Sequence, residues 1–115
     1  RLRLYPNKIR EPDLLFINYA SDPRRQEAYW TGADLVVEVV SPDDRERDLV
    51  VKRQEYAQAG IPEYWIVDPQ AETITVLKLE SDRYVEHGVF GRGEIAVSAY
   101  YPDLQAPVDD VLDAP

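Results

Sequence analysis

The sequence predicts an α/β (α+β) domain with a mixed β-sheet, a central β-α-β unit and a C-terminal β-hairpin. Two observations lead to this fold class. A valine-rich run, a helix-forming segment and a second apolar run follow one another within residues 34–68, and two alternating runs come directly afterwards. A length of 115 residues and a hydrophobic content of 44% suit one domain with one modest core. We therefore treat residues 1–115 as a single domain.

The first predicted strand covers residues 14–19, where β-branched and aromatic side chains follow Pro12 and Asp13. Residues 20–33 are polar and rich in turn formers, which favours an exposed connection. Residues 34–40 form the most apolar run of the chain. Because this run is short and rich in valine, it indicates a strand that is buried on both faces.

Helix signals follow this strand. Asp43 and Glu46 are spaced as in a capping box, in which the two side chains satisfy free N–H groups at a helix start. The spacing predicts a helix over residues 44–59, ended by Gly60 and Pro62. The helical period places one set of residues on a shared face: Arg45, Leu49, Lys52, Tyr56 and Ala59.

The C-terminal half is predicted to be rich in strands. Residues 63–68 form a strand that Pro69 stops, and this strand should run parallel to residues 34–40. Residues 73–79 and 83–87 alternate in polarity and form a hairpin. Three further predictions complete the chain: short strands at 94–98 and 104–108, and an acidic end at 109–113 that frays.

The amino-acid composition excludes several kinds of catalytic and metal-binding site. The chain has no cysteine and one histidine, which excludes disulfides, thiolate catalysis and zinc sites built on cysteine or on histidine pairs. A net charge of −9 means that the surface as a whole repels nucleic acid, although the basic residues concentrate early in the chain. No apolar run approaches the length of a membrane span and no signal peptide is evident, so we expect no membrane partner and a cytoplasmic location.

Three charged residues stand out as candidates for a site. Glu38 lies in the middle of an apolar strand, where an isolated carboxylate would cost several kcal/mol unless it is paired, protonated or bound to a metal. Lys52 lies between Leu49 and Tyr56 on the helix face that packs against the sheet. Asp13 stands at the entrance of a neighbouring strand and supplies a second carboxylate at the same end of the sheet.

Two carboxylates and a lysine suit phosphoryl chemistry. Their hard oxygen ligands favour Mg²⁺, which also binds phosphate oxygens and can activate a bound water. A lysine beside the ion can orient or deprotonate the water, or offset charge on the phosphate.

Simpler interpretations remain open for each residue. Glu38 and Lys52 can form a purely structural ion pair. Lys52 alone can also lie at the edge of the core, with its methylene chain buried and its ammonium in solvent. Asp13 after a proline can be a turn or cap residue. Asp68 before Pro69 is best interpreted as a turn former. Tyr64, Trp65 and the other aromatic residues are more typical of packing than of base stacking, and His87 is assigned no role.

Several blocks of the sequence resemble a known family, the Uma family of bacterial proteins. These proteins are regarded as restriction endonucleases of the PD-(D/E)XK nuclease superfamily. The resemblance covers the chain from about Arg10 to its end and implies a restriction-endonuclease-like core. The blocks that carry it are Glu11–Leu14, Ala33–Pro42, Asp48–Lys52 with Tyr56, Gly60–Pro69 and Tyr101–Leu104.

The resemblance also implies roles for individual residues. Asp13 matches the Asp of the superfamily motif and Glu38 matches its acidic (D/E) position, so both are expected to bind metal. The lysine position of the motif falls on Val40, which could offer only its backbone carbonyl to the metal. In this family the lysine is moved to the following helix, where Lys52 matches it. The expected catalytic residues are therefore Asp13, Glu38 and Lys52.

Two function hypotheses follow. The leading one is a Mg²⁺-dependent endonuclease, with Mn²⁺ as an alternative metal, that hydrolyses DNA phosphodiester bonds, binds DNA weakly and forms a homodimer. The alternative is a non-catalytic interaction or assembly module that keeps the nuclease fold, with Glu38 and Lys52 as an internal ion pair. Members of the family begin with an additional helical segment, so we expect residues 1–115 to be a nuclease-like domain without that segment.

Overall fold

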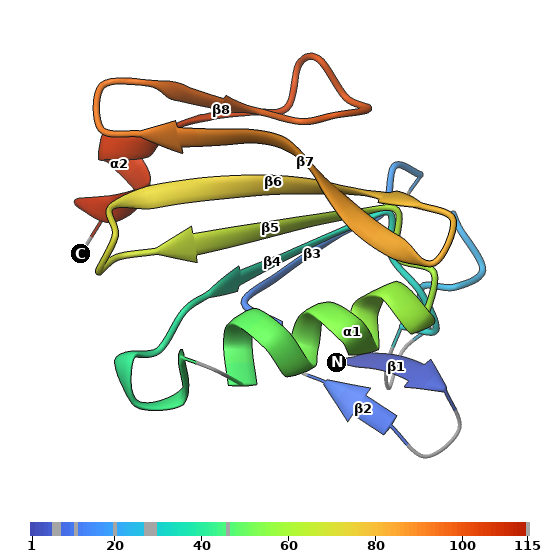
Figure 1. Cartoon of the computed structure of the whole chain (residues 1–115). Helices are drawn as coiled ribbons and strands as arrows, with labels where there is room; N and C mark the ends of the chain where they lie inside the picture. Colours follow the sequence, from blue (N-terminus) through green and yellow to red (C-terminus); the bar gives the residue numbers. More distant parts are fainter. Residues whose placement is uncertain (6–7, 11, 20, 27–29, 46, 115) are drawn as a thin grey trace.

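A five-stranded mixed sheet forms the centre of the protein (Figure 1). The computed structural model describes residues 1–5, 8–10, 12–19, 21–26, 30–45 and 47–114. Within this sheet β4 and β5 are parallel, and the other neighbouring strands are antiparallel. The strand order is β3 (Leu14–Phe16), β4 (Leu35–Val39), β5 (Glu63–Asp68), β6 (Thr73–Glu80) and β7 (Arg83–Gly91).

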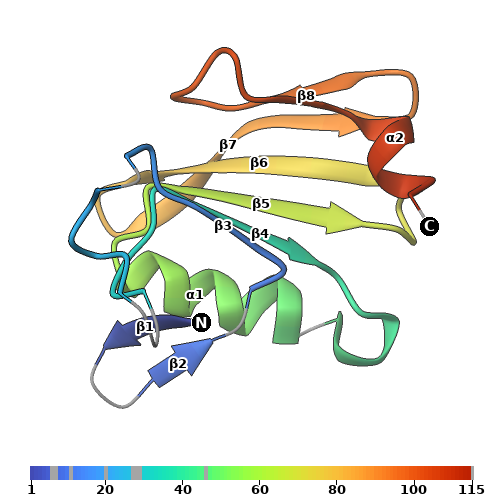
Figure 2. The ribbon, with the colours of Figure 1, turned by 180° about the vertical axis from the view of Figure 1, so that it is seen from behind.

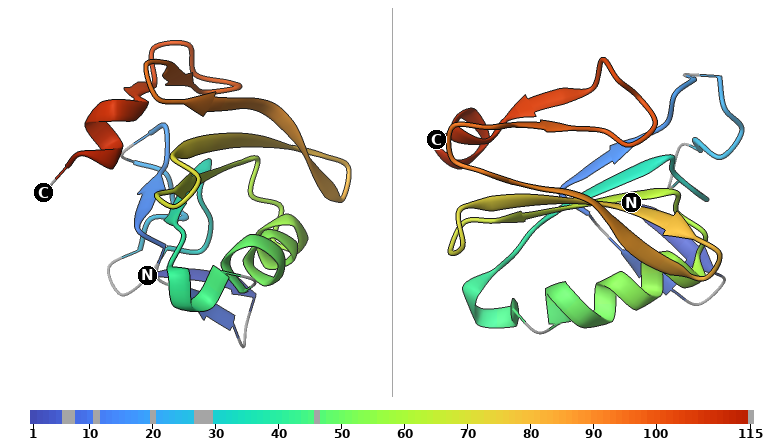
Figure 3. Two further views of the ribbon diagram at one scale, coloured as in Figure 1. Left: turned by 60° about the vertical axis from the view of Figure 1, so that its left-hand side comes forward. Right: turned by 45° about the horizontal axis from the view of Figure 1, so that its top comes forward.

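Each face of the sheet is covered by different elements (Figures 2 and 3). Helix α1 (Lys52–Gln58) and the β1–β2 hairpin (Leu2–Tyr5 and Lys8–Arg10) lie on one side. The β8–β9 hairpin (Ile95–Val97 and Gln105–Pro107) and helix α2 (Val108–Leu112) lie on the other. Two clusters of buried side chains result, one on each face, where the sequence suggested one core. The sheet separates them because its strands are apolar on both sides.

The predicted β-α-β unit is confirmed. Strand β4 pairs in parallel with β5 over five residues, from Leu35 with Glu63 to Val39 with Val67. Side chains alternate along β4 as the period of two requires, with Val36 in the cluster beneath α1 and Leu35 in the cluster beneath α2. Glu38 therefore shares its face with Val36 and with the helix that connects the two strands.

The predicted helix over 44–59 is wrong in its details. A 3₁₀ turn covers Pro42–Asp44, a π-helical segment covers Arg47–Val51, and regular α-helix covers only Lys52–Gln58. Glu46 lies outside the described residues, so the capping box with Asp43 stays a prediction. The helix end is confirmed, because Gly60 adopts a φ of 73°, a left-handed conformation that glycine tolerates best.

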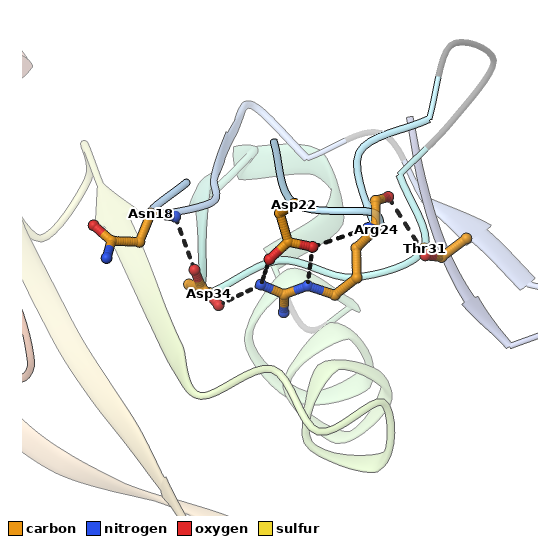
Figure 4. A network of polar contacts seen from close by, with 5 residues as sticks. All are labelled: Asn18, Asp22, Arg24, Thr31 and Asp34. Atoms are coloured by element: carbon orange, nitrogen blue, oxygen red, sulfur yellow. Dashed lines mark hydrogen bonds and ion pairs between the residues drawn. The ribbon is translucent and has the colours of Figure 1, made fainter. Parts of the chain in front are cut away.

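The first predicted strand, 14–19, is shorter than expected and ends at Phe16. Beyond it, the Asn18 backbone N–H donates to Oδ2 of Asp34 at 2.8 Å, as Figure 4 shows. Arg24 donates to carboxylates of both Asp22 and Asp34, each at 2.8 Å, and so ties down the connection that precedes β4. Side-chain bonds replace strand pairing here, which local sequence patterns do not reveal.

The acidic end does not fray, contrary to prediction. Residues Val108–Leu112 form helix α2, and Val108 is fully buried in the cluster on that face. Arg92 forms ion pairs with Asp109 at 3.5 Å and with Asp113 at 2.9 Å. Apolar burial and charge pairing therefore hold a segment whose acidic composition suggested a mobile end.

The remaining predicted strands lie within a few residues of the observed ones. The hairpin of residues 73–79 and 83–87 is longer than predicted, with β6 ending at Glu80 and β7 reaching Gly91. Tyr64 and Trp65 are buried packing residues, as predicted, and His87 is exposed. Among the described residues, no helix has the length and apolarity needed to cross a membrane.

Candidate functional site

The buried carboxylate of Glu38 lies between strand β4 and helix α1. Its side chain is only 3% exposed. The Tyr56 hydroxyl donates a hydrogen bond of 2.8 Å to Oε2 of Glu38, and Nζ of Lys52 lies 3.2 Å from the same oxygen. The structure therefore brings Glu38 and Lys52 together, as the sequence suggested, and adds Tyr56 as a second partner.

The local structure explains how two residues of one helix reach one carboxylate. Lys52 and Tyr56 are four residues apart and so lie on the same face of α1. The π-helical segment Arg47–Val51 ends directly before Lys52. Its wider turn changes the direction in which the side chains after it point. Short π-helical segments are rare and occur frequently at functional sites. Nothing in the local pattern of apolar residues predicted this segment.

Asp13 lies beside Glu38, directly before the start of strand β3. Leu14 pairs with Val37, so the antiparallel register places the preceding residue, Asp13, opposite Glu38 on the same face. Oδ2 of Asp13 accepts a hydrogen bond of 2.7 Å from the backbone N–H of Val39. The Asp13 carboxylate, which is exposed, is close enough to raise the pKa of Glu38.

Opposing effects act on the Glu38 carboxylate. Burial raises its pKa above the ordinary value, and the negative charge of Asp13 adds to this effect. The Tyr56 hydrogen bond and the Lys52 ammonium act in the opposite direction without cancelling it. Burial also raises the pKa of Tyr56, which therefore keeps its proton and remains a hydrogen-bond donor.

A second buried carboxylate, Glu55, ties the β1–β2 hairpin to α1. Arg10 donates to both oxygens of Glu55, through Nε at 3.0 Å and through Nη2, and Nζ of Lys8 lies 3.6 Å away. Burial opposes ionisation of Glu55, but the Arg10 guanidinium lowers its pKa below the usual value. Glu55 raises the pKa of Arg10, and Arg10 is also close enough to Glu38 for that carboxylate to add to the shift, so the hairpin cation lies near the candidate site. The sequence showed the basic residues but not their partner.

Two other predicted positions lie near the end of the parallel strands. Val40 is buried, and its backbone N–H donates to the Val67 carbonyl at 2.8 Å. A role for the Val40 carbonyl in metal binding stays a prediction. Asp68 is the turn former that was predicted, since its Oδ1 accepts from the N–H groups of Gln70 and Ala71, each at 3.1 Å.

A third buried carboxylate, Glu63, was missed in the sequence. It accepts hydrogen bonds from Trp65 Nε1 at 2.7 Å, Ser98 Oγ at 2.8 Å and the Ala99 N–H at 3.0 Å. These donors connect β5 to the segment that follows β8, away from α1. Three donors satisfy the carboxylate, which makes Glu63 a structural residue.

The donor set of Asp13 and Glu38 fits a hard divalent cation. Mg²⁺ typically binds proteins through one or two carboxylates and keeps several waters. Within the described part of the chain, no cluster of three or more histidine or acidic side chains has metal-binding geometry. A site of this kind would therefore rest on two carboxylates, with water and substrate oxygens as the remaining ligands.

The mixed sheet, its β-α-β crossover and the acidic residue within β4 define a restriction-endonuclease-like nuclease fold. The chain belongs to the Uma2 family, whose description is "Putative restriction endonuclease" and which matches residues 1–109. Family membership confirms the resemblance seen in the sequence.

A solved structure shows the same fold. A crystal structure described as "a putative nuclease belonging to DUF820" from Anabaena variabilis ATCC 29413 aligns with a TM-score of 0.58 and 18% sequence identity. The alignment covers 78% of the present chain and 52% of the other, so the chain spans about half the length of that protein. Among curated proteins, no significant match was found. The likeness to this structure shows the fold.

Proposed function

We propose that this chain forms the catalytic domain of a Mg²⁺-dependent endonuclease that hydrolyses DNA phosphodiester bonds, with Mn²⁺ as an alternative metal. The observation that carries the proposal is the buried pair of Glu38 and Lys52 beside Asp13, with a separation of 3.2 Å between Nζ and Oε2. A buried carboxylate with a nearby lysine and a second carboxylate matches the needs of hydrolysis at phosphorus.

In this proposal Asp13 and Glu38 hold the cation, with the Val40 carbonyl as a third oxygen. Bound Mg²⁺ supplies a Lewis acid and lowers the pKa of a coordinated water. Lys52 orients the attacking water or offsets charge that builds up on the phosphate. The Lys52 ammonium reaches the Glu38 carboxylate from α1, so it is placed to contact a substrate phosphate bound beside Glu38.

The basic β1–β2 hairpin supports a polyanionic substrate in spite of the acidic net charge. The first ten residues contain four basic residues and no acidic residue. Two of these, Lys8 and Arg10, share the single carboxylate of Glu55 beside the site. Phosphate contacts from lysine and arginine supply most of the affinity of proteins for DNA. We therefore propose that this hairpin contacts the DNA backbone.

Calorimetric titration with Mn²⁺ tests the metal assignment. The wild-type chain is expected to bind Mn²⁺, and Glu38→Gln is expected to abolish binding. The matched control is Glu63→Gln, which changes a buried carboxylate elsewhere and should leave binding unchanged. Equal binding by the wild type and Glu38→Gln would overturn the assignment of Glu38.

Plasmid nicking in the presence of Mg²⁺ tests the role of Lys52. Cleavage by the wild type should be lost in Lys52→Ala and kept in Lys78→Ala, which removes a lysine from the exposed pair with Glu80. Activity that survives in Lys52→Ala would remove this residue from the mechanism. A homodimer, which would bring two sites to the two strands, stays a prediction that light scattering checks.

One observation favours the second candidate, a non-catalytic interaction module. Tyr56 and Lys52 together satisfy Oε2 of Glu38, as they would in a structural ion pair. A folded wild-type chain that neither binds Mn²⁺ nor cleaves DNA would support this candidate. Mn²⁺ binding that depends on Glu38 would exclude it.

A further inference from the structure

Tyr56 and Lys52 contact the same carboxylate oxygen but differ in burial and in the length of their side chains. The Tyr56 side chain is fully buried, and its ring meets the ring of Tyr64 edge to face, with centroids 5.1 Å apart. Lys52 is 17% exposed and has four rotatable bonds in its stem. The packed ring fixes the position of the Tyr56 hydroxyl, whereas Lys52 reaches the carboxylate through a longer and partly exposed stem.

The chemistry of the two donors differs as well. A phenol hydroxyl carries no charge, so it orients a carboxylate without neutralising the charge that a cation needs. An ammonium competes directly with a cation for the same carboxylate. The packed neutral donor therefore suits a supporting role, and the partly exposed charged donor suits a role toward substrate.

We propose that Tyr56 is the positioning residue of this site, an inference that rests on the proposed function. Its hydroxyl holds Oε2 of Glu38, so the carboxylate keeps its orientation when Lys52 turns toward a substrate phosphate. Oε1 is then the oxygen that Glu38 offers to the divalent cation. Hydrogen bonds of this kind behind a metal ligand reduce the mobility of the ligand and strengthen binding.

The test compares two tyrosines of the same buried cluster. Tyr56→Phe removes the hydrogen bond to Glu38, and Tyr84→Phe removes a bond of 2.7 Å from a buried hydroxyl to the Ile61 carbonyl. Both variants keep the ring and lose one buried hydrogen bond, so both melting temperatures should fall, and that of Tyr56→Phe should fall further because its partner is a carboxylate. Calorimetry with Mn²⁺ should then show about tenfold weaker binding for Tyr56→Phe and an unchanged affinity for Tyr84→Phe.

A second measurement distinguishes positioning of the Glu38 carboxylate by Tyr56 from a general loss of structure in the variant. If Tyr56 acts on the metal ligand, high Mn²⁺ concentrations should restore DNA cleavage by Tyr56→Phe but not by Lys52→Ala. Wild-type affinity in Tyr56→Phe, or equal weakening in both tyrosine variants, would overturn the proposal. Failure of the proposed function gives a different result: the wild type itself binds no Mn²⁺, or Glu38→Gln binds as the wild type does. Either result overturns this inference too.

Discussion

The ammonium of Lys52 lies 3.2 Å from Oε2 of Glu38 and joins helix α1 to strand β4 where both side chains are largely shielded from water. Removal of one member of a buried ion pair strongly destabilises a protein, whereas replacement of both members is often tolerated. Stability and the proposed chemistry therefore depend on the same two residues and have to be measured separately.

Substitution of one or both members of this pair should show strong coupling. Lys52→Met should lower the free energy of unfolding by about 2 kcal/mol, because it removes the ammonium that contacts the buried Glu38 carboxylate. The double variant Glu38→Gln/Lys52→Met should lose less than the sum of the single changes, by about 1 kcal/mol or more. Urea unfolding measures all three variants. Lys78 is partly exposed and provides the control, since Lys78→Met should change stability by less than about 0.5 kcal/mol. Additive losses at Glu38 and Lys52 would contradict the coupling.

DNA binding should depend on Lys8 and not on Lys78. The two lysines are matched, with exposures of 36% and 37% and carboxylate partners at 3.6 Å and 3.5 Å. Lys8→Gln should weaken binding of a DNA duplex and reduce the slope of log affinity against log salt concentration by about 1, the effect of one lost phosphate contact. Lys78→Gln should bind as the wild type does. Fluorescence anisotropy without divalent metal measures both, and equal effects would argue against the basic hairpin as the contact surface.

The pair of Arg45 and Asp68 should make stability depend on pH in the acid range. Arg45 donates to Oδ1 of Asp68 at 2.9 Å and to Oδ2 at 2.6 Å, and these bonds lower the pKa of Asp68 below its ordinary value of 3.8. Because the pKa is lowered in the folded state, the stabilisation is complete above pH 3.8 and is lost as the pH falls through the folded pKa.

Replacement of the Asp68 carboxylate tests this pH dependence. Asp68→Asn should be less stable than the wild type by about 1 kcal/mol at neutral pH, since Arg45 is partly exposed. The difference should shrink as the pH falls below 3.8. Urea unfolding across this range measures it, and a difference that stays constant would contradict the assignment.

Helix α2 should contribute to stability in spite of its acidic composition. Val108→Ala should lower the free energy of unfolding by about 2 kcal/mol, because this side chain, at the start of the helix, is fully buried in the cluster on that face of the sheet. Val50→Ala, at an exposed helical position, should change it by less than about 0.5 kcal/mol. Thermal or urea unfolding compares the two, and a neutral Val108→Ala would indicate that the helix is not docked.

Local patterns in the sequence predicted the main parts of the fold. The β-α-β unit and the β6–β7 hairpin followed from apolar periodicity, which reflects how side chains alternate in strands and recur in helices. Glu38 stood out because a carboxylate in an apolar strand is costly, and its partner Lys52 followed from the helical period. The helix end at Gly60 followed from backbone sterics alone.

Features that depend on distant contacts were missed. The docked helix α2, the π-helical segment before Lys52 and the three donors around Glu63 leave no local signal, because each depends on residues far apart in the chain or on packing. The ion pair of Arg10 with Glu55 spans 45 positions, and it is this pair that brings the basic hairpin next to the site.

The sequence by itself determined which residue types stand on which face of each strand and helix, and hence that Glu38 had to find a partner. Only the tertiary structure decided which cation meets which carboxylate: Lys52 with Glu38, Arg10 with Glu55 and Arg45 with Asp68. The physical reason is that periodicity is a property of neighbouring residues, whereas a charge pair depends on the distance between atoms, which chain folding sets.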